Sequence, residues 1–140
     1  MIEIETNISH LPPEKLWNIL TEDQHIQKWW GKGVSLETKE YGKFYQPWQD
    51  NNGKQHITIG IVTAIDPKKR LQIDWMNPGW PKPTRVDIML TPVASGTKVF
   101  IQHSGWNIFD TETRNREFDA HRMSWHNLLD KLKTYADNFG

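Results

Sequence analysis

The C-terminal part of the chain, residues 110–138, reads DTETRNREFDAHRMSWHNLLDKLKTYADN. Its apolar residues recur at intervals of three or four, and a rotation of about 100° per residue places them on one side of a helix. That side contains Phe118, Trp125, Leu128, Leu129, Leu132 and Ala136, with His121 near its middle. The pattern predicts a long amphipathic helix from about Asp110 to Asn138, which needs an apolar surface to cover.

The segment before this helix carries strand and turn signals. β-branched residues are frequent in its apolar stretches, and Gly, Pro, Asn and Asp cluster between them. The candidate strands are Val34–Thr38, Lys43–Trp48, Ile57–Ile65, Leu71–Met76, Arg85–Leu90 and Thr97–His103. Consecutive strands joined by short turns predict an antiparallel meander. Its apolar face is the surface that the C-terminal helix would cover.

The N-terminal residues predict one more strand and two short helices. Residues 2–8 alternate between apolar and polar, as a half-buried strand does. Pro12-Pro13 suits the first turn of a helix. Residues 21–24 have the spacing of a capping box, which predicts a second helix from Glu22 to about Trp29. We therefore expect an α+β fold, with a curved antiparallel sheet wrapped around the C-terminal helix and two short helices after the first strand.

Composition narrows the classes of function. The 140 residues contain 17 Lys+Arg and 17 Asp+Glu, and this balance argues against a protein that mainly grips nucleic acid. The chain has no Cys, no apolar run long enough for membrane insertion and no signal-peptide pattern, so we expect a cytoplasmic location. We find no linker or repeat and expect one domain over residues 1–140. Eight Trp residues predict a core or cleft built from broad aromatic rings.

Several short motifs, in this order and spacing, resemble a known family. They are Pro13-Glu14-Lys15-Leu16-Trp17, Trp30-Gly31, Gly42-Lys43-Phe44, residues 65–71 with Trp75 downstream, Leu90-Thr91-Pro92, Gly96-Thr97-Lys98-Val99, His103-Ser104-Gly105, and the last helix with Trp125 and Leu132. The chain resembles the activator of heat-shock-protein-90 ATPase homologue family within the SRPBCC (START/Bet v 1-like) superfamily. The resemblance implies a helix-grip fold with a deep cavity between sheet and long helix. Superfamily members bind lipids, hormones and polyketides, and a minority catalyse reactions.

The alternation of strand residues predicts which side chains face the helix. Leu71, Ile73 and Trp75 share one face, as do Val86, Ile88 and Leu90, and also Val99, Ile101 and His103. The same alternation places Asp74 and Asp87 on the opposite, solvent-facing side. Loop alternation in a meander brings Trp30, Trp80 and Trp106 to one rim, either as the mouth of a pocket or as a cap on the core.

From these patterns we predict a ligand pocket. Its predicted lining is Trp75, His103, Phe118, His121 and Trp125, with Trp30 and Trp48 nearer the rim. His103 and His121 are the polar groups most suited to enter an apolar pocket, where an imidazole could orient a ligand, act as a general base or serve only the structure. His121 and His126 are five residues apart and fall on different helix faces, so we expect no metal site, and no motif indicates a cofactor.

Three functions remain open from the sequence. The leading hypothesis is a non-enzymatic protein that binds a small hydrophobic ligand, aromatic, lipid-like or polyketide-like. The first alternative is a cyclase- or hydratase-type enzyme that uses His103 or His121 for acid–base chemistry. The second alternative is a co-chaperone-like module that engages a chaperone and stimulates its ATPase. The sequence also leaves open whether two copies form a homodimer.

Overall fold

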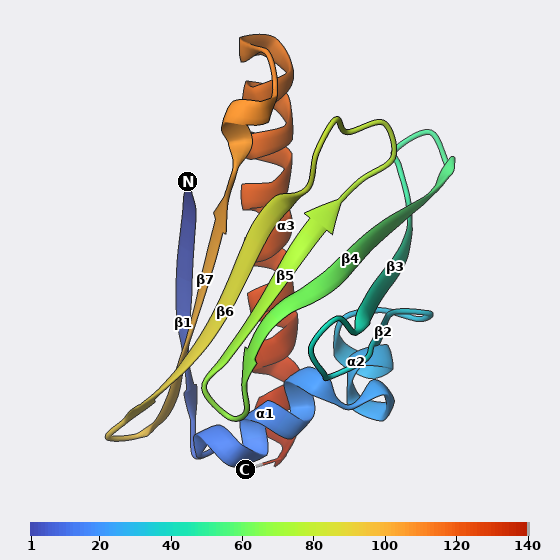
Figure 1. The fold of residues 1–140 in the computed structure, drawn as a ribbon. Coiled ribbons are helices and arrows are strands. Elements are labelled where there is room, and N and C mark those ends of the chain that lie inside the picture. Colours follow the sequence, from blue (N-terminus) through green and yellow to red (C-terminus); the bar gives the residue numbers. More distant parts are fainter. Residues whose placement is uncertain (140) are drawn as a thin grey trace.

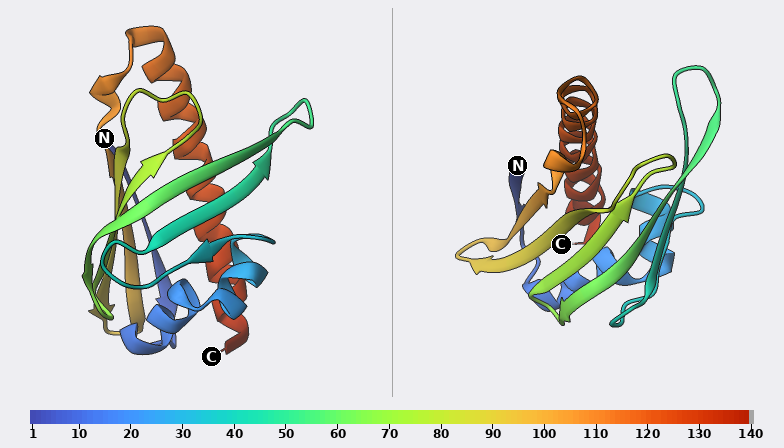
Figure 2. Two further views of the ribbon diagram at one scale, coloured as in Figure 1. Left: turned by 45° about the vertical axis from the view of Figure 1, so that its right-hand side comes forward. Right: turned by 45° about the horizontal axis from the view of Figure 1, so that its top comes forward.

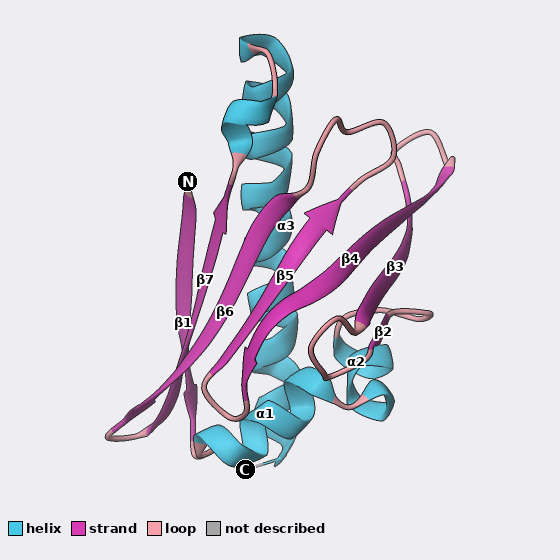
Figure 3. Ribbon diagram, viewed as in Figure 1, coloured by secondary structure: helices cyan, strands magenta, loops and turns pink. Residues whose placement is uncertain are grey.

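The computed structural model describes residues 1–139 and shows a curved sheet beside one long helix (Figure 1). The elements are β1 (Ile2–Ser9), α1 (Pro13–Thr21), α2 (Asp23–Trp29), β2 (Ser35–Leu36), β3 (Lys43–Gln49), β4 (Gln55–Asp66), β5 (Arg70–Met76), β6 (Thr84–Val93), β7 (Gly96–Ser104), the 3-10 turn η1 (Trp106–Ile108), α3 (Thr111–Ala136) and the 3-10 turn η2 (Asp137–Phe139). The predicted fold class is confirmed, with helices and strands in the expected order (Figure 3).

The sheet has seven strands in the order β1-β7-β6-β5-β4-β3-β2, and the pairs are antiparallel. Strands β3 to β7 form the predicted meander, and β1 closes the edge beside β7. The helix α3 lies across one face of this sheet. In the half of the sheet away from β1, the hairpin of β3 and β4 projects away from α3, as both views in Figure 2 show. The two layers therefore diverge toward that hairpin.

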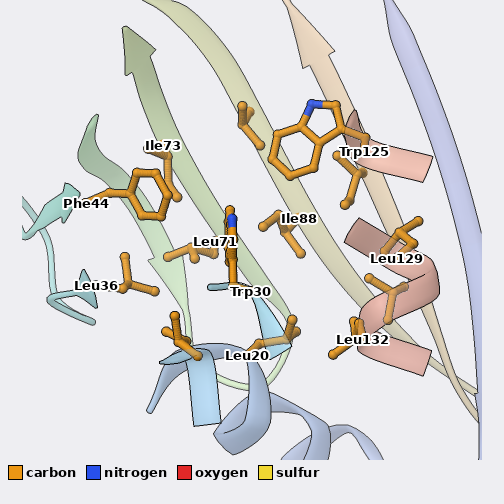
Figure 4. Close-up of a cluster of buried hydrophobic side chains, with 14 of the residues drawn as sticks. Leu20, Trp30, Leu36, Phe44, Leu71, Ile73, Ile88, Trp125, Leu129 and Leu132 are labelled. Atoms are coloured by element: carbon orange, nitrogen blue, oxygen red, sulfur yellow. The ribbon is translucent and has the colours of Figure 1, made fainter. Parts of the chain in front are cut away.

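The predicted alternation along the central strands is confirmed. The side chains of Ile73 on β5, Val86 on β6 and Val99 on β7 are at most 1% exposed. They pack against the apolar side of α3, where Trp125, Leu129 and Leu132 are buried (Figure 4). Burial of about 25 cal/mol per Å² of apolar surface is the main stabilising contribution to such a core. The apolar pattern of sheet and helix thus determines which faces meet.

Two local predictions at the N-terminal half are wrong. The capping box does not form, because Thr21 donates its hydroxyl to the Trp17 carbonyl at 2.7 Å and Glu22 makes no side-chain cap to α2. The strand expected at 34–38 is only two residues long, since Ser35 and Leu36 pair with the first part of β3 and the chain then turns away. The upper part of β3, including Pro47, is therefore an edge, where a residue without an N–H is tolerated.

The outer face of the sheet corrects one further expectation. Asp74 does lie partly exposed there, 3.5 Å from Arg85. Asp87 points the same way but is 8% exposed, because Arg70 and Gln72 on β5 cover it and donate hydrogen bonds to its carboxylate. Burying a carboxylate is costly unless it is hydrogen-bonded, and these hydrogen bonds offset that cost for Asp87. Among residues 1–139, none of the helices has the length and apolarity required to cross a bilayer.

Candidate functional site

A cleft of about 360 Å³ opens where α3 and the outer half of the sheet diverge. Helix α3 forms one wall, and strands β3, β4 and β5 form the other. Trp30, the residue after α2, closes the bottom. Its lining comprises Trp30, Gln46, Trp48, Gln49, Thr58, Trp75, Asn77, Glu117, Ala120, His121, Ser124, Trp125 and Leu128. Gln49, Ala120 and Ser124 are exposed, so the cleft communicates with solvent between the helix and the end of β3.

The deep wall of the cleft depends on a glycine in the middle of β4. Gly60 pairs with Phe44 on one side and Trp75 on the other, and the rings of these two neighbours stack with centroids 5.1 Å apart. A Cβ at position 60 would meet Ile73 Cγ2 at 2.6 Å and the Asp74 carbonyl oxygen at 2.8 Å. The absence of a side chain at Gly60 therefore lets two aromatic rings from flanking strands meet over it.

Further indoles extend this wall onto the helices. Trp125 on α3 lies 5.2 Å from the Trp75 ring, and Trp30 lies 5.1 Å from Phe44 and 6.2 Å from Trp125. These tilted and edge-on arrangements suit the quadrupoles of aromatic rings and add to area burial. In Figure 4 Trp30 stands between the sheet and α3. The rings of Phe44, Trp75, Trp125 and Trp30 thus form one continuous aromatic surface, which we call the aromatic floor.

His103 lies behind this floor and is fully buried. Its Nδ1 accepts a hydrogen bond from Trp125 Nε1 at 3.0 Å, and its Nε2 lies 2.6 Å from Thr84 Oγ1. Because the Thr84 hydroxyl donates to the Trp75 carbonyl, the network places the imidazole hydrogen on Nε2. Burial lowers the pKa of His103 well below its ordinary value, and the neighbouring His121 lowers it further. His103 is a neutral ring with both nitrogens paired inside the protein.

His121 faces the cleft from the middle of α3. Its Nδ1 lies 2.8 Å from the Glu117 carbonyl oxygen, which only accepts, so Nδ1 carries the hydrogen. Its Nε2 receives the Trp75 indole N–H at the long distance of 3.4 Å. Burial lowers the pKa of His121, and the bond to the Glu117 carbonyl partly opposes this. Both ring nitrogens are thus engaged, and the long bond from Trp75 to Nε2 is the one that a ligand donor or a proton can replace.

Polar groups ring the outer part of the cleft. Trp48 Nε1 donates to Thr58 Oγ1 at 2.9 Å, and the Thr58 hydroxyl donates in turn to Asn77 Oδ1. On the helix, the Glu117 side chain is 24% exposed, and burial raises its pKa while Arg116 opposes the shift. The cleft therefore combines an aromatic floor with a polar rim, which is typical of a binding site for a small molecule.

Comparison with known proteins identifies the family. A family model described as "Activator of Hsp90 ATPase homolog 1-like protein" matches residues 10–137. The chain belongs to this family. A comparison with curated proteins found no match.

Solved structures share the fold of this chain, and two of them are 26% identical to it. It is similar to protein MLL2253 from Mesorhizobium loti, with 26% identity, a TM-score of 0.77 and coverage of 99% of this chain and 98% of that one. It is similar to the Aha1 dimer of Colwellia psychrerythraea, with 26% identity, a TM-score of 0.70 and coverage of 94% and 92%. It shares its fold with DynU16, from the dynemicin biosynthetic locus, with 16% identity, a TM-score of 0.76 and coverage of 97% and 46%.

The structure brings most of the predicted pocket residues together. Five of the seven predicted residues line the cleft: Trp30, Trp48, Trp75, His121 and Trp125. Two predicted residues do not line it. His103 is enclosed behind Trp75 and Trp125, and Phe118 turns toward Trp106, with ring centroids 5.8 Å apart.

The predicted aromatic rim is wrong for Trp30. Trp80 and Trp106 do lie together, with ring centroids 6.1 Å apart, but both are buried and act as a cap on the core. Trp30 packs instead against Trp29, Phe44 and Trp125. Figure 1 shows the reason, because α2 lies at the end of the sheet opposite the loop between β5 and β6.

Apart from His121, sequence reasoning missed the polar residues of the cleft. Glu117, His121, Ser124 and Leu128 follow a spacing of three or four and so share a helix face, which was a usable signal. On the strands, Gln46 and Trp48 continue the inward face of Phe44, and Asn77 continues that of Trp75. Within residues 1–139, no group of three His, Cys, Asp or Glu side chains is arranged to hold a metal ion.

The two buried imidazoles predict a dependence of stability on pH. Burial lowers the pKa of His103 and of His121 in the folded state, whereas unfolding restores a value near 6.5. Below pH 6.5 the unfolded chain therefore binds more protons, so stability falls as the pH falls. For each ring the slope approaches at most about 1.4 kcal/mol per pH unit, and it acts only between the ordinary pKa and the lowered pKa of the folded state. Urea denaturation between pH 7.5 and 5.5, above the usual range of carboxylates, measures this slope.

The variant H121N is the control for this slope. It removes one of the two buried imidazoles, and we expect the pH slope of the free energy of unfolding to become smaller. Equal slopes for the two proteins would show that His121 does not titrate in the expected way. A wild-type stability independent of pH over this interval would contradict the neutral assignment of both rings.

Proposed function

We propose that this domain binds a small, largely apolar molecule in the cleft between α3 and strands β3 to β5. The observation that carries the proposal is the wall of four indoles, Trp30, Trp48, Trp75 and Trp125, with a few polar groups at its edge. Ligand sites commonly combine a mostly apolar lining with a few placed polar groups, in volumes of about 300–1,000 Å³. At about 360 Å³ the cleft suits a compact ligand.

The positions of the polar groups support binding rather than a filled core. Thr58, Asn77, Glu117 and His121 converge on the same cavity from three different elements. Hydrogen bonds to one another and to the indoles hold Thr58, Asn77 and His121 in fixed positions around the cavity, which supports a preorganised binding site. DynU16, from the dynemicin biosynthetic locus, shares the fold, and this similarity extends to architecture alone.

A dye titration with a blocking variant tests the proposal. Ser124 is exposed and lines the cleft, so S124F places a ring in the cavity. The neutral, environment-sensitive dye prodan should bind wild type saturably, with a blue-shifted emission. We expect S124F to weaken this binding at least about tenfold, which corresponds to about 1.4 kcal/mol. Because the dye binds the folded state, it should also raise the apparent Tm of wild type, and it should raise that of S124F less.

The matched control is N127F. Asn127 is exposed on the same helix but does not line the cleft, so the new ring should leave dye affinity within about twofold of wild type. Equal affinity in wild type, S124F and N127F would place the dye elsewhere, for example on the exposed apolar residues Ile57, Ile59 and Ile61 of β4. That result would overturn the proposal.

Acid–base catalysis is a second candidate function, and one observation favours it. His121 is a neutral imidazole in the cleft, and the carboxylate of Glu117 lies 3.9 Å from its Nδ1. Such a pair can exchange protons with a bound substrate. His103 is too enclosed for this role. For an enzyme, H121N would abolish turnover of the bound compound while binding remained.

Two partner hypotheses rest on the family and its members. The family description supports a chaperone partner, and stimulation of a chaperone ATPase that is unaffected by S124F would favour it over ligand binding. The similar Colwellia protein is described as a dimer, which supports pairing of two copies of this chain. The exposed row of Ile57, Ile59 and Ile61 on β4, beside Tyr45 on β3, is the apolar surface that such a pair would cover.

A further inference from the structure

The charged side chain in the lining of the cleft is negative. Glu117 is the one carboxylate among the lining residues that the structure describes, and none of them is Lys or Arg. The imidazole of His121 is neutral, since burial lowers its pKa. On the same helix Arg116 is exposed and does not line the cleft, although it opposes the raised pKa of Glu117 and both residues line a second depression beside Trp80. An anionic ligand would thus meet a carboxylate without a cation to pair with.

Three of the four cleft indoles have their N–H groups engaged within the protein. Trp48 donates its N–H to Thr58, Trp75 to His121 and Trp125 to His103. These three donors are therefore occupied by protein acceptors. One face of Trp48 stacks on His56 and one face of Trp75 stacks on Phe44, so each ring has one further face, negative in its π-electron density, for another neighbour. A ring with its donor engaged elsewhere is suited to a positively charged or apolar neighbour.

These two features complement each other on opposite walls. The sheet contributes the rings of Trp48 and Trp75, and α3 contributes Trp125 together with the Glu117 carboxylate. Aromatic faces and a carboxylate around one cavity are the arrangement that recognises ammonium groups, because the ring quadrupole and the formal charge attract the same ion. The low polarity of the aromatic floor weakens the screening of that attraction by water.

We propose that the ligand of this cleft carries a positively charged nitrogen, an organic ammonium group held between the indole rings and the Glu117 carboxylate. This inference rests on the proposed binding function and specifies the chemical class of its ligand. The rest of such a ligand is apolar, since the deeper part of the cavity is formed by Trp30, Trp75, Trp125 and Leu128.

A pair of isosteric probes separates charge from shape. Benzyltrimethylammonium has a quaternary nitrogen where neopentylbenzene has a quaternary carbon, and the two molecules are otherwise alike in size. The cation is more strongly hydrated in water than the neutral probe, so it loses more hydration free energy when it binds. A preference for the cation therefore reports attraction by the site. We expect benzyltrimethylammonium to displace prodan from wild type with at least about tenfold higher affinity than neopentylbenzene.

The variant E117Q tests the carboxylate, and E112Q is its control. Glutamine keeps the size of the side chain, and Glu112 is an exposed residue in the first turn of the same helix, outside the cleft. We expect E117Q to weaken the cation about tenfold and to leave neopentylbenzene unchanged. E112Q should leave both affinities within about twofold of wild type. Thermal unfolding of each variant checks that the fold is retained.

The outcomes distinguish this inference from the proposed function. Equal affinities of the two probes for wild type, or an E117Q variant with an unchanged ratio of affinities, overturn the ammonium proposal. If prodan binds in the cleft by the S124F criterion while neither probe displaces it, the ammonium proposal also fails and the binding function stands. If prodan does not bind in the cleft, the binding function itself fails.

Discussion

Replacing Trp125 by alanine is expected to lower the free energy of unfolding by about 3–5 kcal/mol. The indole is 3% exposed and lies within 6.2 Å, centroid to centroid, of Trp30, Trp75 and His103. Its removal leaves a cavity between α3 and the sheet and takes away the donor of the His103 Nδ1 hydrogen bond. Urea denaturation followed by circular dichroism measures the loss, and prodan binding should disappear with the cleft wall.

The variant W125F separates packing from hydrogen bonding. Phenylalanine retains much of the ring contact but leaves His103 Nδ1 without a donor, and an unsatisfied buried polar atom costs about 1–3 kcal/mol. We therefore expect W125F to be destabilised less than W125A. The variant M123A, at a 67% exposed position of the same helix, should stay within about 0.5 kcal/mol of wild type. A W125A effect as small as that of M123A would contradict the packing described for α3.

Replacing Gly60 by alanine is the second change with a large expected effect, and its sign separates propensity from tertiary structure. Glycine inside a strand is usually unfavourable by about 0.5–1 kcal/mol relative to alanine, so propensity alone predicts stabilisation. The structure predicts the opposite, since the new Cβ would lie 2.8 Å from the backbone oxygen of Asp74 and 2.6 Å from Ile73 Cγ2. We expect a destabilisation of about 1–3 kcal/mol, as for other overpacked sites.

The readout for G60A includes the aromatic stack. Separation of β4 from β5 displaces Trp75 from Phe44, so the near-ultraviolet circular dichroism should change together with stability. G31A is the matched control, because a Cβ there meets Val34 Cγ2 at an ordinary 3.6 Å. If G60A proved as stable as G31A or more stable than wild type, the glycine would not be what allows the two rings to meet.

The sequence determined the architecture because the architecture depends on periodicity. The two-residue alternation of β5, β6 and β7 and the helical spacing of α3 each define one apolar face, and burying those faces leaves one arrangement of sheet on helix. The same local rule correctly brought Trp75, His121 and Trp125 to one cavity. The same rule failed for Phe118, which belongs to the predicted apolar side of the helix but turns toward Trp106.

The tertiary structure alone decided how side chains from different elements meet. Parity placed Asp87 on the outer face, but only the pairing of β5 with β6 brings Gln72 opposite it and hides it from solvent. His103 was expected in the pocket, yet Trp75 and Trp125 close over it and satisfy its ring. Trp30 and Gly60 acquire their roles from neighbours distant in sequence. Contacts of this kind depend on which residues of neighbouring strands stand opposite each other and on how far the helix and the sheet diverge, and both become defined only when the elements pack together.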